Sequence, residues 1–208
     1  MLIAEQLMLL CIDPQRGECD ASLAHVDVNS LAAAALILDL AEQRRLRYKG
    51  GHVAIETLIP TTHPQLSHAA QVLAGPVNGL QMGAAIELLV SRLNPVSRHL
   101  LESLFRRDVL HKARKSWWPW SRTYFPLRSL QARNEAIAQL HNAALADSIS
   151  LRGLGLLVLT DFAGQLASSL SGNAHEAAAQ KLLHLTREPV GDDAEHDMLV
   201  HLRRSLLS

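Results

Sequence analysis

Three tryptophans, Trp117, Trp118 and Trp120, stand almost side by side and are the only tryptophans in the 208-residue chain. Cationic side chains accompany them on both sides: Lys112, Arg114, Lys115 and Arg122. Tryptophan prefers the headgroup level of a bilayer, and each Lys or Arg near an anionic membrane surface contributes about 1 kcal/mol of attraction. The combination predicts a tip whose indole rings enter a lipid surface while the cations hold phosphate groups.

Other chemistry is compatible with the same residues. Aromatic rings between cations can stack on single-stranded nucleic acid. Trp and Arg are also favoured where two proteins meet, so the tip is equally typical of a protein contact or an oligomer interface. A fourth alternative is that the rings fold back and close the hydrophobic core. The residue types alone leave these alternatives open.

The charge of the chain is unevenly distributed. Lys plus Arg number 20 and Asp plus Glu number 20, which excludes a uniformly basic protein that coats nucleic acid. Residues 92–133, however, contain ten basic and two acidic residues. A cluster of this size attracts anions and steers a charged partner. Four arginines that precede the tryptophans are therefore the candidate ligands of phospholipid headgroups: Arg92, Arg98, Arg106 and Arg107.

No pattern of catalytic or metal-binding residues emerges. The 11 histidines are scattered, and none has the spacing of a zinc-protease helix. No glycine-rich phosphate loop and no G-x-S-x-G elbow is present. Asp161, in an apolar stretch, is expected to pair with Arg152 or with a neighbouring helix. We therefore predict that the protein is not an enzyme and has no metal and no cofactor.

Two cysteines, Cys11 and Cys19, make no disulfide framework and fit a reducing compartment. The N-terminal residues lack the basic leader of a signal peptide. The most apolar stretch, residues 151–170, contains Arg152 and Asp161 and falls short of the roughly 20 apolar residues that span a bilayer. We expect a cytoplasmic protein that associates with a membrane peripherally.

Hydrophobic periodicity and breaker residues predict a single, mostly α domain over residues 1–208. We expect a helical globule around a central apolar helix bundle, with one or two small β-hairpins. Helices are predicted over residues 2–12, 31–45, 64–73, 83–93, 95–107, 129–146, 151–170, 175–185 and 195–207. Ser30 is the expected cap of the second helix, and Leu130, Ile137, Leu140 and Leu145 are the expected apolar face of the sixth. Gly153, Gly155 and Gly164 are expected to allow close packing of the helix over residues 151–170.

Two hairpins are predicted between these helices. The first lies in residues 47–59, where Lys49-Gly50-Gly51 separates the short β-prone runs 46–48 and 52–55. The second is irregular, spans residues 109–128 and carries the tryptophans at its tip. Pro119 and Pro126 make a continuous helix there unfavourable.

Several segments follow a known order of motifs. Residues 2–13 (LIAEQLMLLCID) are similar to L-x-E-E-x-x-L-L-x-L-x-D, and the apolar residues 33–40 followed by Gln43-Arg44-Arg45-Leu46 are similar to A-x-L-x-E-L-x-x-x-G-R-L. Residues 104–110 (LFRRDVL) resemble L-x-x-x-G-V-L. Residues 123–126 and the helix that follows them resemble an R-Y-P…R passage. Residues 151–170 resemble an apolar core helix. In this order the motifs resemble the Golgi phosphoprotein 3 family, whose bacterial members have a similar length.

The resemblance implies a mostly helical globule with a projecting β-hairpin, here at residues 110–125. Eukaryotic members are peripheral Golgi proteins that bind phosphatidylinositol 4-phosphate through an early-loop Trp and three arginines, and they act as adaptors for glycosyltransferase tails. Their hairpin contributes to membrane contact and self-association. Counted back from Asp108, the two helix arginines of the family fall on Asn94 and Ser97, with Arg98 one position away and Arg92 two. The remaining ligands fall near Ala33 and near residues 24–25.

Our leading hypothesis is a non-enzymatic protein that binds anionic phospholipid headgroups through residues 92–133 and the tryptophan tip. The alternative is an interaction module that uses the same hairpin to form a homo-oligomer. Nucleic-acid binding ranks lowest. Residues 44–56 could form a DNA-contacting wing after a helix, but residues 31–40 are too apolar to form the helix that would enter the groove. The protein client, if the family's adaptor role applies, is not specified by these residues.

Overall fold

The computed structural model describes residues 1–19, 26–59, 61–75, 79–114, 123–147, 150–187 and 194–207. Ten helices lie in this part of the chain: α1 (Ile3–Cys11), α2 (Val28–Glu42), α3 (Pro64–Leu73), α4 (Met82–Leu93), α5 (Val96–Arg106), α6 (Leu130–Leu145), α7 (Leu151–Phe162), α8 (Leu166–Ser169), α9 (Gly172–Arg187) and α10 (Ala194–Leu207). The strands are β1 (Leu46–Lys49), β2 (His52–Ile55), β3 (Leu80–Gln81), β4 (Ala113–Arg114) and β5 (Thr123–Tyr124). The predicted fold class, mostly α with small hairpins, is confirmed.

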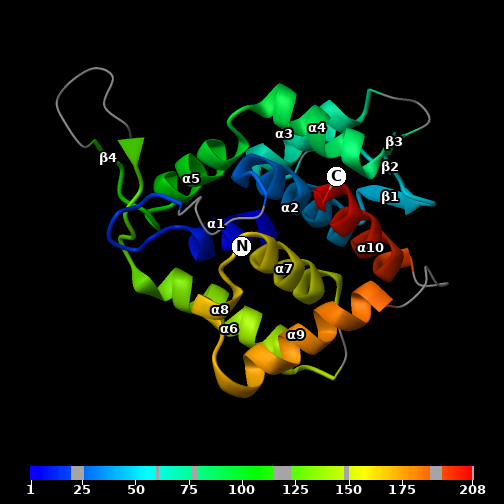
Figure 1. Cartoon of the computed structure of the whole chain (residues 1–208). Coiled ribbons are helices and arrows are strands. Elements are labelled where there is room, and N and C mark those ends of the chain that lie inside the picture. Colours follow the sequence, from blue (N-terminus) through cyan, green and yellow to red (C-terminus); the bar gives the residue numbers. More distant parts are fainter. Residues whose placement is uncertain are drawn as a thin grey trace.

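The centre of the molecule consists of α1, α2 and α7, which pack against one another (Figure 1). Every residue of α1 is buried, and so are all ten residues from Leu31 to Leu40 in α2. Helices that are apolar on every face are stable only in an interior, which confirms the predicted central bundle. At Gly155 of α7, a Cβ would lie 2.6 Å from Leu38 Cδ1 of α2, so the absence of a side chain permits this close approach.

The other helices surround this centre. α6 packs against α1, α7 and α9, while α4 and α5 pack against α2 (Figure 1). β1 and β2 form the first predicted hairpin around Gly50 and Gly51, and β3 adds a third antiparallel strand. α10 packs against α4, α7 and β1. The β4–β5 pair lies at the opposite side of the molecule from β1–β3, beside α5 (Figure 1).

Ser30 does not cap the second helix, so that prediction is wrong. α2 begins at Val28, and the Asp27 carboxylate accepts hydrogen bonds from the backbone N–H groups of Asn29 and Ser30 at 3.0 and 3.1 Å. Apolar periodicity begins only at Leu31, which explains why the sequence pattern placed the start three residues late. The helix also ends earlier than predicted, because Arg44 has a positive φ of 54°.

The predicted long helix over residues 151–170 is two helices. α7 ends at Phe162, and Gly164, with φ of +67°, turns the chain before α8. A glycine with positive φ just beyond the last turn is a common helix stop. Gly164 therefore terminates the helix, whereas Gly153 and Gly155 do allow close packing, as predicted.

The apolar face predicted for α6 is partly wrong. Leu130 and Leu145 are 60% and 43% exposed. The buried stripe is formed instead by Ala136, Leu140 and Ala144, which are four residues apart. Alanines on this stripe let α6 approach the centre closely, so the large side chains at its ends are left outside.

Candidate functional site

α5 presents a charged outer surface because most of its apolar residues lie on one side. Val96, Leu100 and Leu104 are buried, whereas Arg98 and Arg106 are exposed. Figure 1 shows α5 at the side of the molecule where β4 and β5 project.

The base of the β4–β5 hairpin is fixed by the turn that follows α1. Ala113 pairs with Tyr124, Arg114 pairs with Thr123, and Leu110 forms an isolated bridge with Leu127. The backbone N–H of Phe125 donates to Gly17 O at 2.8 Å, and that of Leu127 donates to Pro14 O at 3.2 Å. The Phe125 ring is only 3% exposed, so this aromatic belongs to the core. The base of the predicted second hairpin is thus present, and the turn after α1 holds it in place.

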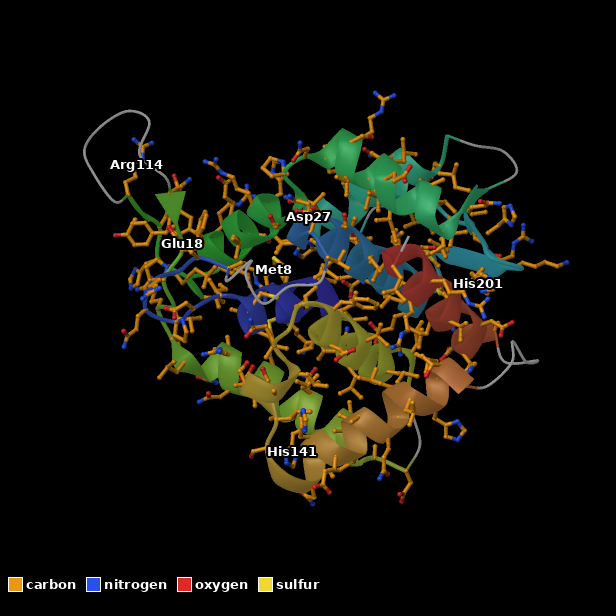
Figure 2. All side chains as sticks on the ribbon, in the orientation of Figure 1. Met8, Glu18, Asp27, Arg114, His141 and His201 are labelled. Atoms are coloured by element: carbon orange, nitrogen blue, oxygen red, sulfur yellow. The ribbon has the colours of Figure 1, made fainter. Side chains whose placement is uncertain are left out.

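Six of the predicted site residues lie in the described part of the chain, and all six are exposed. We call these exposed cations the basic face: Arg92 at the end of α4, Arg98, Arg106 and Arg107 on and just after α5, and Lys112 and Arg114 on the hairpin. Figure 2 labels Arg114 on the hairpin. The other five predicted residues lie outside the described residues: Lys115, Trp117, Trp118, Trp120 and Arg122.

Glu102 is the carboxylate that contacts two cations of the basic face. Glu102 Oε1 is 3.4 Å from Arg98 Nε and 3.4 Å from Lys112 Nζ, so it links α5 to the hairpin. Partial burial would raise the pKa of Glu102, but Lys112 and Arg98 hold it below its ordinary value. The Lys112 ammonium is also 5.9 Å from the centre of the Phe105 ring, which is 38% exposed. Sequence reasoning missed Glu102 and Phe105, although Glu102 follows Arg98 at the four-residue spacing of a helical ion pair.

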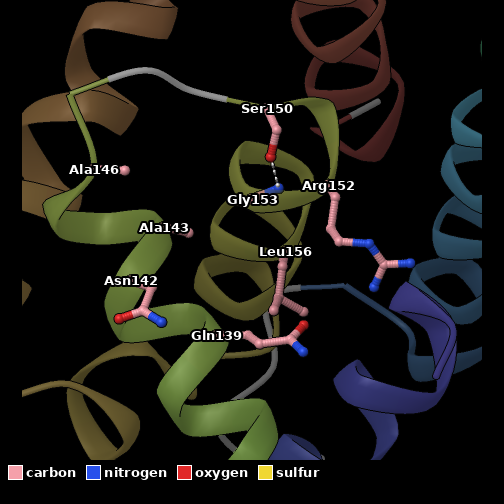
Figure 3. Close-up of a pocket in the computed structure, with 8 residues that line it drawn as sticks. All are labelled: Gln139, Asn142, Ala143, Ala146, Ser150, Arg152, Gly153 and Leu156. Carbon is pink, nitrogen blue, oxygen red and sulfur yellow. Dashed lines mark hydrogen bonds between the residues drawn. The ribbon is translucent and has the colours of Figure 1, made fainter.

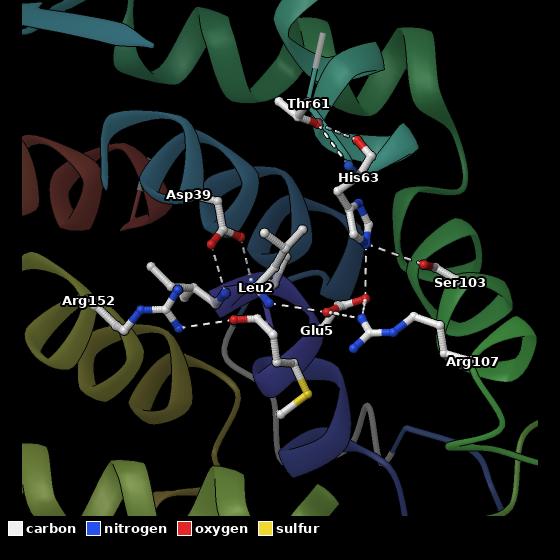
Figure 4. A network of polar contacts seen from close by, with 11 residues as sticks. Leu2, Glu5, Asp39, Thr61, His63, Ser103, Arg107 and Arg152 are labelled. Atoms are coloured by element: carbon white, nitrogen blue, oxygen red, sulfur yellow. Dashed lines mark hydrogen bonds and ion pairs between the residues drawn. The ribbon is translucent and has the colours of Figure 1, made fainter. Parts of the chain in front are cut away.

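Arg107 differs from the rest of the basic face because its guanidinium reaches a buried carboxylate. Arg107 Nη1 donates to both oxygens of Glu5, at 2.7 and 2.8 Å (Figure 4). His63 Nε2 is 2.9 Å from Glu5 Oε1 and 3.3 Å from Ser103 Oγ. Burial alone would raise the pKa of Glu5, but the hydrogen bonds from His63, Arg107 and the Leu2 amide lower it to about 2. Arg107 therefore compensates a buried charge, with about half of its side chain left exposed.

A second buried carboxyl anchors the same end of α1. Asp39 of α2 accepts hydrogen bonds from the backbone N–H groups of Ile3 and Ala4, at 2.8 and 3.0 Å (Figure 4). Burial raises the pKa of Asp39 to about 7, against the opposing effect of these two bonds. Sequence reasoning missed both buried carboxyl groups, Asp39 and Glu5. The signal that could have revealed them is an acidic residue inside each of two apolar helices.

Arg152 pairs with Glu42 and not with Asp161. The prediction that Arg152 is a partner of Asp161 is therefore wrong. Arg152 Nε and Nη2 donate to the two Glu42 oxygens at 2.6 and 2.7 Å, and Nη1 donates to Met1 O and Gln6 Oε1. Arg152 also lines a cavity of about 250 Å³ between α6 and α7, together with Gln139, Asn142 and Leu156 (Figure 3). It is the one charged side chain in that lining, and its guanidinium is already bonded.

Within the described residues, no group of three or more His, Cys, Asp or Glu side chains is arranged to hold a metal ion. No helix among these residues is both long enough and apolar enough to cross a bilayer. Among the residues predicted for the site, the structure brings Arg98 and Lys112 together on the Glu102 carboxylate, with the exposed Phe105 ring beside Lys112. Such a surface is suited to holding anionic oxygens.

Comparison with known proteins identifies a family. The family model described as Golgi phosphoprotein 3 (GPP34) matches residues 3–201, nearly the whole chain. A search of curated proteins finds no match.

Proposed function

The chain belongs to the Golgi phosphoprotein 3 family, and from this premise we propose that it is a non-enzymatic, peripheral membrane protein that binds anionic phospholipid headgroups. The basic face contacts the phosphates, and Trp117, Trp118 and Trp120 insert into the interface. The protein acts on the cytoplasmic side of its membrane.

The observation that carries this proposal is the arrangement of α5 beside the hairpin. α5 contributes Arg98 and Arg106, and the hairpin contributes Lys112 and Arg114, all exposed on neighbouring elements. Phe105 adds exposed apolar surface next to Lys112. Cations that surround an exposed aromatic match the interfacial zone of a bilayer, which is anionic at the headgroups and apolar beneath them.

The specific headgroup is a finer question. The resemblance implies phosphatidylinositol 4-phosphate, with two family arginines at the positions of Asn94 and Ser97. In this chain the Ser97 N–H and hydroxyl donate to Asn29 Oδ1 at 3.1 and 2.8 Å, so this start of α5 is already bonded internally. We propose that Arg92, Arg98, Arg106 and Arg107 bind anionic headgroups in general, without a pocket for the inositol ring.

Sedimentation with liposomes tests the proposal. Wild-type protein should bind vesicles that contain phosphatidylglycerol and leave pure phosphatidylcholine vesicles unbound, with no large preference for phosphatidylinositol 4-phosphate at equal surface charge. Replacing Trp117, Trp118 and Trp120 together by Ala should reduce binding sharply, and far-UV circular dichroism checks that the variant is folded. Unchanged binding by this variant would rule out insertion.

The same triple Trp-to-Ala variant also tests the alternative function, a hairpin that forms a homo-oligomer. If the protein is an oligomer that dissociates when the three tryptophans are removed, and neither form binds lipid, the hairpin is an assembly contact. Analytical ultracentrifugation of both proteins without lipid gives this answer directly.

A further inference from the structure

Glu102 occupies the place where two cations of the basic face converge. A single oxygen, Oε1, contacts both Arg98 and Lys112, and the Glu102 side chain is 30% exposed. Any phosphate held between these two cations would therefore lie next to a negative charge. Arg106, four residues further along α5, has no ion pair with Glu102.

The carboxylate weakens the attraction for different anions to different extents. Coulomb energy is proportional to the product of the two charges, so the repulsion from Glu102 is twice as large for a dianion as for a monoanion. A phosphodiester headgroup such as phosphatidylglycerol has one negative charge. A phosphomonoester has a second ionisation near pH 6 and therefore approaches two negative charges above neutral pH.

We propose that Glu102 is the specificity-determining residue of the basic face: by weakening the attraction for doubly charged phosphomonoesters most, it reduces the preference for them over phosphodiesters that Arg98 and Lys112 create. This inference rests on the proposed function and deepens it. Glu102 acts on the ligand through its charge, and it also positions Lys112 against α5.

The test compares two lipids of matched surface charge. Vesicles of phosphatidylcholine contain either phosphatidylglycerol or phosphatidic acid at pH 8, with mole fractions adjusted to equal zeta potential. Glu102→Gln removes the charge and keeps the shape and hydrogen-bonding capacity of the side chain. Glu176→Gln is the matched control, because Glu176 is an exposed acid on α9, away from α5.

In Glu102→Gln the affinity for phosphatidylglycerol vesicles should rise about fivefold, the effect of one unit charge near an anionic surface, and that for phosphatidic acid vesicles should rise more, so the preference shifts toward phosphatidic acid. Glu176→Gln should keep the wild-type ratio. If wild-type and Glu102→Gln bind anionic vesicles with the same ratio, this inference is overturned and the proposed function stands. If no variant binds any anionic vesicle, both are overturned.

Discussion

Asp39 and Glu5, two carboxyl groups without exposed surface, hold the start of α1 from two sides. Asp39 receives the Ile3 and Ala4 amides, and Glu5 receives the Leu2 amide and the Arg107 guanidinium. Their environments shift the two pKa values in opposite directions, to about 7 for Asp39 and about 2 for Glu5. The difference arises because Glu5 has a full positive charge in contact, whereas Asp39 has mainly backbone dipoles.

Asp39 should make stability depend on pH near neutrality. Its pKa of about 7 in the folded protein exceeds the ordinary value of 3.8. The stability that protonated Asp39 contributes to the folded protein is fully present below pH 3.8. It is lost as the pH rises through 7. The free energy of unfolding of the wild type should therefore fall by about 1 kcal/mol per pH unit between pH 5 and 7, relative to Asp39→Asn. Glu5 does not overlap this window, because its stabilisation is lost only as the pH falls from 4.5 toward 2.

Urea unfolding of both proteins at pH 5, 6, 7 and 8 measures this difference. Asp39→Asn is less stable overall, because an amide offers one acceptor to two N–H groups, but only the slopes are compared. If the free energy of unfolding changes with pH equally in the two proteins, Asp39 is not the group that titrates.

Arg107 and Arg98 should differ in their effect on stability although both belong to the basic face. Arg107→Met leaves the Glu5 carboxylate buried with only His63 and the Leu2 amide, and should cost about 3 kcal/mol in the free energy of unfolding. Arg98→Met removes an ion pair that is 53% exposed on the Arg98 side, and should cost less than about 0.5 kcal/mol. Chemical denaturation of the two variants checks the contrast. Equal losses would mean that Glu5 does not depend on Arg107 for compensation.

The turn after α1 packs closely against the base of the β4–β5 hairpin. Gly17 has φ of +65°, and a Cβ there would lie 2.2 Å from the Pro126 nitrogen. Gly17→Ala should therefore break the Gly17–Phe125 contact and destabilise the protein by about 2–4 kcal/mol, through backbone strain and a steric clash together. Hydrogen exchange at the Phe125 and Leu127 amides should accelerate, because their acceptors lie in this turn.

Gly50→Ala provides the matched control for this change. Gly50 also has a positive φ, of 56°, but nothing lies within 4 Å of its hypothetical Cβ. This variant should cost about 1–2 kcal/mol, from the backbone alone. If Gly17→Ala costs no more than Gly50→Ala, the turn does not press against the hairpin.

Local patterns predicted most elements because helices begin and end at recognisable residues. Pro64 and Leu73 are the predicted and observed ends of α3, and Gly50 with Gly51 gives the first hairpin. Errors arose where a tertiary contact decides the outcome. Asp39 caps α1 from another helix, and α6 buries Ala136 and Ala144 beside Leu140 while the leucines at its two ends stay exposed. For the candidate site, sequence found the cations, but the convergence of Arg98 and Lys112 on Glu102 requires the fold.

At the scale of the whole molecule, the charges separate by region. Residues 1–43 contain seven acidic residues and one basic residue, and residues 134–208 contain nine acidic and five basic residues. The largest positive excess, ten basic against two acidic residues, lies in residues 92–133, and residues 44–91 add four basic against two acidic residues. A negatively charged membrane attracts the exposed cations of α5 and the hairpin and repels exposed carboxylates elsewhere, such as Glu176 on α9. The membrane should therefore orient the protein with α5 and the hairpin toward the headgroups.

Orientation can be read from hydrogen exchange on vesicles that contain phosphatidylglycerol. Amides of α5 and of residues 110–114 and 123–127 should gain protection, whereas those of α9 should exchange as in free protein. Binding should weaken at least tenfold between 0.1 and 1 M salt, because the Debye length falls from about 10 to about 3 Å. An Arg98→Gln, Arg106→Gln double variant should bind more weakly and lose less on adding salt, since fewer ionic contacts remain to be screened. Protection on α9, or binding that salt leaves unchanged, would mean that the charge separation does not orient the protein.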